Sequence, residues 1–361
     1  MSNETILSIC IPVYNRVDVF SVSLFVAAEA ANGHADKVEI VVSDNASEDD
    51  IKSVVENVSK KFPKVSIQYS RNSENLGLAG NFLKVAEVAQ GEYCWIVGSD
   101  DFVLASGLEA ILRIIKENPD IDFMSVEFAG VDLLKKPSST SFIDYVGSLS
   151  LHPKMWIKRR IKVKSGEKVW DELVDPAYKN VLLGSMMCGI FRTQLWNSID
   201  KSIIKPSTKF TSIENTYPHC YIYSKCMTGR KAWYFDEPCI LSGSGLRDWA
   251  GEDGRSFWLT STPVIVMKVF PELVESYRVG GLESRQVKKA RRWAASRVGG
   301  LFFPYLLRKH ILRMSVEGSE LIDERLLLRN YRGSIFFYLG PFILGAKGIG
   351  RLFLKLCRKA S

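Results

Sequence analysis

Residues 7–16 read LSICIPVYNR, a mainly apolar run that ends in a turn. A continuous run of this length, closed by Pro12 and Asn15, predicts a strand that is buried on both faces. Strands of this kind occur in parallel sheets, whose neighbouring strands are joined by helical crossovers. The run therefore favours an α/β fold that starts close to the N-terminus.

The following ~110 residues alternate between two hydrophobic periods. Apolar residues at helical spacing occur in 16–31, 51–61, 79–89 and 105–118, and strand-like apolar runs occur in 38–42, 65–69, 93–97 and 123–128. This alternation predicts a largely parallel sheet with helices on both faces and right-handed crossovers. Ligands of such sheets bind beyond the carboxyl ends of the strands, so the residues after each strand are the candidate site residues.

Two adjacent carboxylates follow one of these strands in Val97-Gly98-Ser99-Asp100-Asp101. Their mutual repulsion is costly unless a cation offsets it, and a divalent ion that bridges a diphosphate would do so. The alternative is a solvated Ser-Asp turn that caps the next helix. The residues alone leave both interpretations open.

Two further polar segments follow strands at the same predicted edge. Asp44 lies in Ser43-Asp44-Asn45-Ala46-Ser47, where a carboxylate can bind a base or ribose, or can instead form an Asx turn before a helix. Gly77 lies in Asn75-Leu76-Gly77-Leu78-Ala79-Gly80-Asn81, where it permits a ligand to approach the backbone, or simply allows a helix to begin.

The order and spacing of these segments are more specific than any one of them. PVYN at 12–15, SDNAS at 43–47, NLG at 75–77 and GSDD at 98–101 resemble the nucleotide-sugar half of family 2 glycosyltransferases with the GT-A fold. The resemblance covers about residues 6–130. The run GEYCWIVG at 91–98 is most similar to the abequosyltransferase-like subgroup, which decorates bacterial surface polysaccharides.

The resemblance implies a role for individual residues of this sequence. Tyr14 matches the residue that lies against the nucleobase, with Pro12 in the same wall. Asp44 matches the carboxylate that reads the base, and Asp100 matches the carboxylate near the ribose. The implied donor-binding set is Pro12, Tyr14, Asn15, Asp44, Asn75, Gly77 and Asp100.

The resemblance also implies a metal ion, Mg²⁺ or Mn²⁺, held by Asp101. The family motif is often Asp-x-Asp, and its first position here is Ser99. The pair Asp100-Asp101 must therefore hold the ion without a third carboxylate.

The family's catalytic base usually lies in an acidic pair before a helix in the second half of the chain. Glu214 is the best match, although the second acid of the pair is replaced by Asn215. Asp248 or Asp253, in a Gly- and Ser-rich loop at 242–254, are the alternatives. Glu214 can equally be a helix-start carboxylate that the helix dipole stabilises.

Composition limits the class of protein. The 361 residues are 46% hydrophobic, carry a net charge of +8 and include seven cysteines without a C-x-x-C pair. These values predict a globular protein with reduced thiols and an anionic partner. The start of the chain lacks the apolar core of a signal peptide, and no apolar run reaches the ~20 residues that span a bilayer, so we expect a cytoplasmic location.

Basic residues gather near the C-terminus beside apolar ones. Lys288, Lys289, Arg291, Arg292 and Arg297 surround Trp293, and residues 333–361 mix aromatic, aliphatic and basic residues. This pattern predicts a segment that lies on a membrane surface without crossing it, and the resemblance implies that this surface is the inner membrane. The alternative is an ordinary packed helix with a solvated face. No nucleic-acid-binding motif occurs, so we expect no nucleic-acid partner.

The sequence thus predicts three segments: a nucleotide-sugar-binding half at 1–130, an acceptor-binding half at 131–280 and a basic, amphipathic helical C-terminus at 281–361. The predicted function is the transfer of a sugar from a nucleotide-sugar to a saccharide or lipid-linked oligosaccharide in bacterial surface polysaccharide synthesis, with inversion implied by the resemblance. An inactive nucleotide-sugar-binding homologue and, less favoured, a basic nucleic-acid-binding protein are the alternatives.

Overall fold

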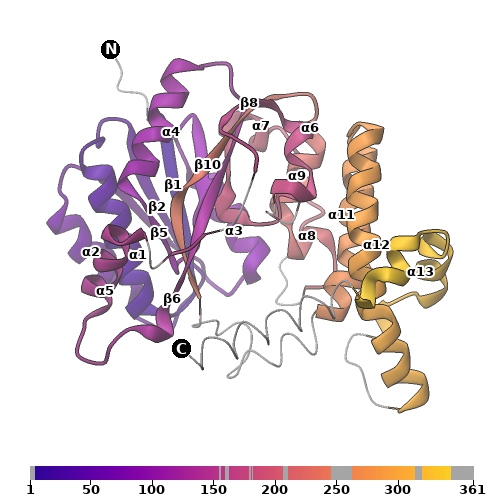
Figure 1. The fold of residues 1–361 in the computed structure, drawn as a ribbon. Helices are drawn as coiled ribbons and strands as arrows, with labels where there is room; N and C mark the ends of the chain where they lie inside the picture. Colours follow the sequence, from indigo (N-terminus) through magenta and orange to yellow (C-terminus); the bar gives the residue numbers. More distant parts are fainter. Residues whose placement is uncertain are drawn as a thin grey trace. The chain divides into compact units, whose positions relative to one another are not determined.

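The computed structural model describes residues 5–153, 156–158, 162–178, 180, 182–205, 210–244, 262–313 and 319–342. The chain divides into two compact units. Unit 1 comprises residues 1–208 and 217–247 and is built around a sheet, and unit 2 comprises residues 209–216 and 248–361 and is helical (Figure 1).

The sheet of unit 1 has the strand order β3-β2-β1-β4-β9-β6-β10-β5. Its long pairings are parallel: β1 pairs with β2 and β4, β2 with β3, and β6 with β10. β9 lies between β4 and β6 and runs antiparallel to both, so the long strands share one direction. The strands are β1 (Leu7–Val13), β2 (Val38–Asp44), β3 (Ser66–Arg71), β4 (Tyr93–Ile96), β5 (Asp101–Val103), β6 (Phe123–Asp132), β7 (Ile157–Lys158), β8 (Gly166–Val169), β9 (Gly189–Arg192) and β10 (Lys231–Ser244).

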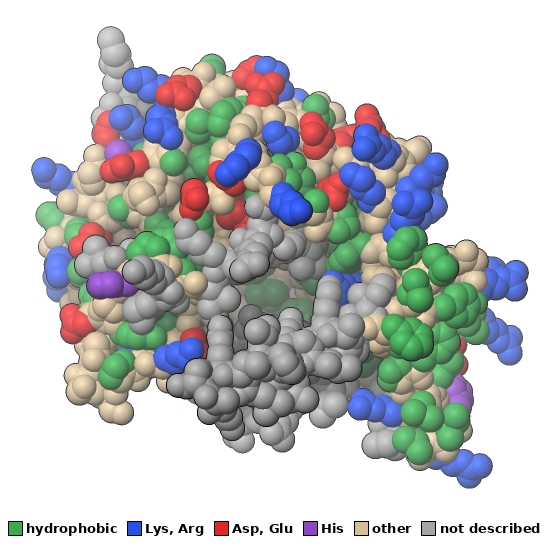
Figure 2. All heavy atoms as spheres, viewed as in Figure 1, with side chains coloured by type: hydrophobic (Ala, Val, Ile, Leu, Met, Phe, Trp, Pro, Cys, Tyr) green, Lys and Arg blue, Asp and Glu red, His purple; other side chains and the backbone are tan. Residues whose placement is uncertain are grey.

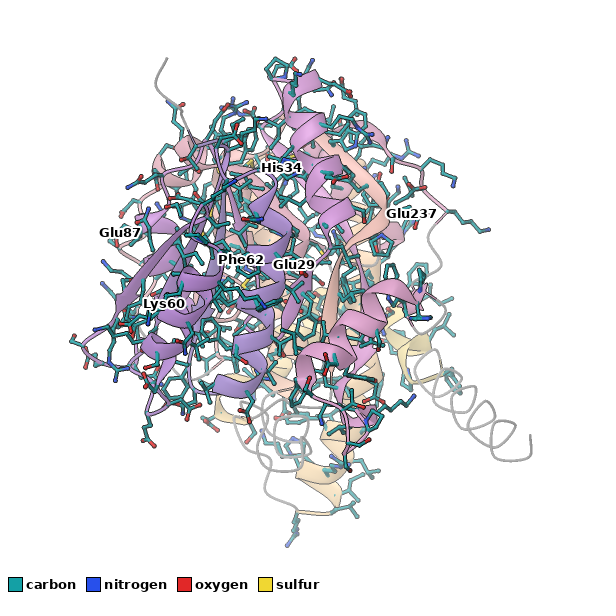
Figure 3. All side chains as sticks on the ribbon, turned by 90° about the vertical axis from the view of Figure 1, so that its left-hand side faces the viewer. Glu29, His34, Lys60, Phe62, Glu87 and Glu237 are labelled. Carbon is teal, nitrogen blue, oxygen red and sulfur yellow. The ribbon has the colours of Figure 1, made fainter. Side chains whose placement is uncertain are left out.

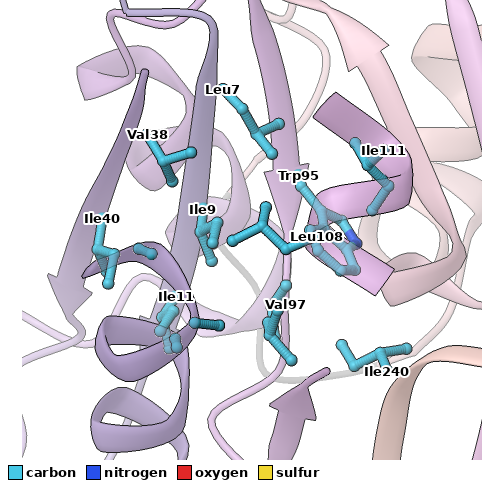
Figure 4. Close-up of a cluster of buried hydrophobic side chains, with 14 of the residues drawn as sticks. Leu7, Ile9, Ile11, Val38, Ile40, Trp95, Val97, Leu108, Ile111 and Ile240 are labelled. Atoms are coloured by element: carbon cyan, nitrogen blue, oxygen red, sulfur yellow. The ribbon is translucent and has the colours of Figure 1, made fainter. Parts of the chain in front are cut away.

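Helices cover both faces of the sheet, as the alternating pattern predicted. α1 (Val17–Asn32), α2 (Ile51–Lys61) and α4 (Ala105–Glu117) close one face over a core that contains Leu7, Ile9 and Ile11 (Figure 4). Phe62, labelled in Figure 3, lies on this face. Its ring packs edge to face with that of Phe25, and the two ring centroids are 5.2 Å apart. α3 (Gly77–Val88) packs against β1 and β2 on the other face. The predicted α/β class with a mostly parallel central sheet is confirmed.

The position of β1 determines where a ligand can bind. The chain runs from β1 outward to β2 and β3, and then returns to place β4 on the opposite side of β1. The connections that leave the ends of β1 and β4 therefore diverge. A ligand crevice forms at such a reversal of strand order, beyond the carboxyl ends of the strands.

Some elements differ from the sequence-based prediction. β10 was not predicted, because Asp236, Glu237 and Pro238 interrupt its apolar pattern, and its register with β6 shifts at Pro238. β10 continues to Ser244, so the start of the loop predicted at 242–254 is strand, and residues 245–261 lie outside the described residues. The apolar run at 182–191 becomes strand only from Gly189, and Leu182 and Leu183 adopt positive φ angles.

The segment between β6 and β9 carries its own short elements. It contains α5 (Phe142–Leu151), α6 (Trp170–Leu173) and the short strands β7 and β8. α7 (Thr193–Asn197) and α9 (Pro218–Cys226) complete the described helices of unit 1.

Unit 2 is formed by helices with one apolar core. α11 (Phe270–Val279), α12 (Ser284–Leu306) and α13 (Glu324–Tyr331) are its main described helices, and the short α8 (Ile213–Thr216) also belongs to it. Phe337 is fully buried against Phe302 and Tyr331, where the backbone of residue 337 touches Gly299. Part of the predicted surface segment 333–361 is therefore core. No helix among the described residues is long and apolar enough to cross a membrane.

Candidate active site

The turn after β1 is strained and is held by its neighbour. Asn15 and Arg16 have φ angles of 54° and 67°, a left-handed conformation that costs a non-glycine residue free energy. The Asn15 amide donates a hydrogen bond to Ser47 Oγ at 2.8 Å, and Asn15 Oδ1 accepts one from the Glu48 amide at 2.8 Å. These bonds tie the turn to the loop after β2, and Tyr14 is left 44% exposed at the edge.

Asp44 ends β2 as a fully buried carboxylate with three hydrogen-bond donors. Its Oδ1 accepts from the Ser47 amide at 2.8 Å, and its Oδ2 accepts from Tyr69 Oη at 2.9 Å and Arg71 Nη1 at 2.6 Å. The Ser47 bond spans three residues, one more than in the predicted Asx turn, and it orders the loop after β2. The N-cap of α2 is instead Asp50, whose Oδ1 accepts from the Ser53 amide.

These contacts decide the charge of Asp44. Burial alone would raise its pKa, but the hydrogen bonds from Ser47, Tyr69 and Arg71 outweigh burial and leave the pKa lowered. Burial and the same carboxylate raise the pKa of Tyr69 to about 12, so its hydroxyl stays protonated and continues to donate. Asp44 is therefore an ionised and already ordered group.

Asparagine side chains connect the loop after β2 to the start of α3. Asn45 Nδ2 donates to Asn75 Oδ1 at 2.8 Å, and Asn45 Oδ1 accepts from the Leu76 amide at 2.9 Å. Asn75 Oδ1 also accepts from the amide of Gly77, which has a φ of 71° that suits glycine. Deeper in the protein, Asn81 Nδ2 donates to the Ser43 carbonyl at 3.1 Å.

The turn between β4 and β5 brings two carboxylates over one glycine. A Cβ atom placed on Gly98 would lie 2.7 Å from Asp101 Oδ2 and 3.1 Å from Asp100 Oδ1, so both oxygens lie close to Gly98. The Gly98 amide donates to Asp101 Oδ2 at 3.1 Å. Asp100 Oδ2 pairs with Arg16 Nη2 at 3.3 Å, which links this turn to the turn after β1.

The Asp101 carboxylate lacks sufficient positive charge around it. Burial, and then the charge of Asp100, raise its pKa to about 8, against the opposing effects of Ser242, Gly98 and Arg16. A cation next to both carboxylates would favour their ionised forms.

The residues present fit a divalent ion that also binds a phosphate ligand. Asp100 Oδ1 and Asp101 Oδ2 are hard oxygen ligands, and both lie close to Gly98. Among the described residues no group of three or more His, Cys, Asp or Glu side chains could hold an ion by itself. Mg²⁺ is commonly held by one or two carboxylates together with substrate phosphates, and this donor set matches that arrangement.

The structure brings the predicted donor residues together beyond the carboxyl ends of the parallel strands β1, β2 and β4. Hydrogen bonds and one ion pair join the segments 13–16, 43–49, 72–81 and 98–101. Pro12 is buried within β1, next to Tyr14. Arg16, Tyr69 and Arg71 also lie at this site and were not predicted from the sequence. Arg71 is the register partner of Asp44 on β3, a signal that only a correct strand alignment could have given.

The predicted catalytic base lies in the other unit. Glu214 is partly exposed in α8, and Asn215 Oδ1 accepts hydrogen bonds from the Thr211 and Ser212 amides. Asn215 is the third residue of this short helix and reaches back to the amides before it, as the third helical residue of a capping box does. The alternative bases, Asp248 and Asp253, lie outside the described residues.

His219, at the start of α9 in unit 1, is buried beside aromatic rings. Its ring centroid lies 6.5 Å from that of Phe82 and 5.8 Å from that of Tyr223. Burial lowers the pKa of His219 to about 4, so the imidazole is neutral at pH 7. A packed, uncharged ring is the role that the structure gives it.

Comparison with known sequences finds glycosyltransferases. Abequosyltransferase RfbV of Salmonella typhimurium is 35% identical over 130 residues, which cover 36% of this chain and 38% of the relative. The GalNAc(5)-diNAcBac-PP-undecaprenol beta-1,3-glucosyltransferase of Campylobacter jejuni is 28% identical over 150 residues, which cover 39% and 47%. The matches thus span less than half the length of these relatives.

Comparison with solved structures and family models extends the similarity along the chain. TarS 1–349 of S. aureus in complex with UDP-GlcNAc matches with a TM-score of 0.54 and 17% identity, over 91% of this chain and 80% of that chain. The likeness supports the GT-A fold. The model of glycosyl transferase family 2 matches residues 8–227. With more than half of its residues covered by that model, the chain belongs to glycosyl transferase family 2.

Proposed function

We propose that this protein transfers a sugar from a nucleotide-sugar donor to a saccharide acceptor in bacterial surface polysaccharide synthesis. The supporting observation is the bonded edge of the sheet, where Tyr14, Asp44, Asn75 and Asp100 lie on four connected segments. The exposed Tyr14 ring offers an apolar face for a base, and the ordered Asp44 loop forms the adjoining wall. Residues 1–130 serve the donor in this proposal, and 131–280 the acceptor.

A divalent ion, Mg²⁺ or Mn²⁺, would be held by Asp101 together with Asp100. When bound, such an ion supplies positive charge to the departing diphosphate. The residues of the chain hold the ion and the donor in register, because Asp100 also pairs with the turn that presents Tyr14. A family 2 relationship and a carboxylate pair support this assignment.

The acceptor hydroxyl needs a base, and we propose Glu214 for that role, with inversion at the anomeric carbon. Glu214→Gln should lower turnover by about 10²-fold or more while donor binding stays unchanged, because the amide keeps the shape but cannot take a proton. Asp248→Asn and Asp253→Asn are the matched comparisons. A loss of turnover in either of these, with Glu214→Gln active, would assign the base to residues 248–253.

We further propose that the acceptor is lipid-linked and that unit 2 lies on the cytoplasmic leaflet of the inner membrane. One relative is named for a PP-undecaprenol-linked substrate. Residues 262–361 carry 19 Lys and Arg against 7 Asp and Glu, whereas residues 1–261 carry 29 against 33. Hydrophobic and basic side chains lie close together over the helices of unit 2 (Figure 2), and Ile335 and Phe342 are 66% and 73% exposed.

The buried Phe337 determines how the membrane proposal can be tested. Truncation before residue 337 would damage the core of unit 2, so surface substitutions are preferable. The double variant Ile335→Glu/Phe342→Glu should bind anionic liposomes much more weakly and keep its melting temperature. Unchanged liposome binding would assign the exposed face another role.

An inactive nucleotide-sugar-binding homologue is the remaining alternative, because Ser99 and Asn215 replace acids of the family motifs. A screen of UDP-, CDP-, GDP- and dTDP-sugars for donor hydrolysis separates the two. The proposed function predicts slow hydrolysis of at least one donor in the presence of Mn²⁺. Binding of a donor without any turnover, with acceptor lipids supplied, would favour the inactive homologue.

A further inference from the structure

Arg16 occupies a position that a flexible surface arginine would not hold. It is the N-cap residue of α1 with a φ of 67° and a ψ of 40°, directly after the left-handed Asn15. Asn15 is bonded to Ser47 and Glu48, and the Val17 amide donates to Asp49 Oδ2 at 2.9 Å. The backbone on both sides of Arg16 is thus fixed, and its strain must be offset by these bonds.

The side chain of Arg16 reaches the carboxylate turn from this fixed backbone. Arg16 Nη2 lies 3.3 Å from Asp100 Oδ2, and the two side chains are only 13% and 23% exposed. Because water is partly excluded, such charges influence one another more strongly than they would at a solvated surface.

The two oxygens of Asp100 face different neighbours. Oδ2 pairs with Arg16, whereas Oδ1 faces Gly98 together with Asp101 Oδ2. A divalent ion held by Asp100 Oδ1 and Asp101 Oδ2 would therefore share Asp100 with a guanidinium. The two cations repel each other, so the affinity of this site for an ion alone is reduced.

We propose that Arg16 is the resident counter-ion of the Asp100–Asp101 pair, and that it makes binding of a divalent ion depend on a nucleoside diphosphate. The negative charges of a diphosphate offset the repulsion between ion and guanidinium, so each ligand tightens binding of the other. This inference rests on the proposed function and assigns a positioning role to a residue outside the predicted donor set.

The test is a titration of the metal-free full chain with Mn²⁺ alone, followed by electron paramagnetic resonance. Arg16→Gln removes the charge and should tighten Mn²⁺ binding on the order of tenfold. Arg16→Asn should do the same, and asparagine tolerates the left-handed backbone, so this variant guards against misfolding of the turn. With a saturating nucleoside diphosphate, the difference from the wild-type chain should shrink several-fold.

Two controls separate charge from shape. Arg16→Lys keeps the positive charge and should stay within about twofold of wild type, as should Arg113→Gln, which removes an arginine exposed on α4. Equal or weaker Mn²⁺ binding by both neutral Arg16 variants would overturn the inference alone. Absence of Mn²⁺ binding by every variant, even with nucleoside diphosphate present, would overturn the metal assignment of the proposed function as well.

Discussion

Asp44 and Asp101 are both buried carboxylates at strand ends, yet their surroundings are opposite in character. Asp44 ends β2 and receives hydrogen bonds from Ser47, Tyr69 and Arg71, which keep its pKa lowered. Asp101 starts β5 next to a second carboxylate, and burial with that neighbour raises its pKa to about 8.

The difference indicates how the two groups would serve one ligand. The Asp44 loop has a complete set of bonds without any ligand, so it presents a fixed wall. The Asp100–Asp101 turn sets two carboxylates against the guanidinium of Arg16, so it still gains when a divalent cation binds. The Asp44 loop would thus provide a preformed binding surface, and the Asp100–Asp101 turn would provide affinity that depends on a bound cation.

The largest expected effect is at Asp101, the proposed metal ligand in the turn between β4 and β5. Asp101→Asn keeps the shape of the side chain and removes its charge. Metal-dependent nucleotide binding and sugar transfer should fall by roughly 10³-fold or more, because the ion loses a ligand. Calorimetry and a transfer assay measure both, with circular dichroism as the control for folding. Full activity of this variant, or of wild type in EDTA, would remove Asp101 from the metal site.

Asp44→Ala should have a smaller effect that does not depend on metal. Removal of the carboxylate takes a partner from a buried polar group of the bound nucleoside, at a cost of roughly 1–3 kcal/mol. Nucleoside diphosphate binding should weaken by a similar amount with Mn²⁺ and with EDTA. An unchanged dissociation constant would leave Asp44 with only its turn-forming role.

Gly98→Ala probes the shape of the cation site. The added Cβ would lie 2.7 Å from Asp101 Oδ2, so the carboxylate must move and Mn²⁺ affinity should fall on the order of tenfold. Gly33→Ala is the matched control, since nothing lies within 4 Å of its added Cβ. Equal Mn²⁺ affinity of the two variants would show that these oxygens do not hold the ion.

The smallest expected effect is on the free energy of unfolding at acidic pH, to which Asp44 contributes. The pKa of Asp44 is lower in the folded chain than in the unfolded chain, so its contribution to stability is present at neutral pH and is lost as pH falls below about 4. Asp44→Asn should therefore reduce the dependence of the unfolding free energy on pH in this acidic range. Denaturant titrations at several pH values measure this dependence. The same dependence on pH in Asp44→Asn and wild type would show that Asp44 does not contribute to it.

The sequence predicted the fold, and the carboxyl ends of the strands as the place of the polar segments, because both depend on local patterns. The run 7–13 and the alternation that follows it specify parallel strands, and Asp44 and Asp100 follow directly from where those strands end. The sequence could not reveal Arg16 or Arg71, because their roles come from contacts 84 and 27 residues away. β10 was missed because Pro238 and acidic residues hide its pattern.

The most direct test of the whole account is a calorimetric titration of the full chain with UDP, CDP, GDP and dTDP. Each nucleotide is titrated once with Mn²⁺ and once with EDTA, into wild type and Asp101→Asn. If Asp101 holds an ion that contacts the nucleotide, at least one nucleotide should bind wild type about tenfold or more tightly with Mn²⁺ than with EDTA. This gain should disappear in Asp101→Asn. Binding that is equally tight in EDTA, or no binding of any of the four nucleotides, would contradict this assignment.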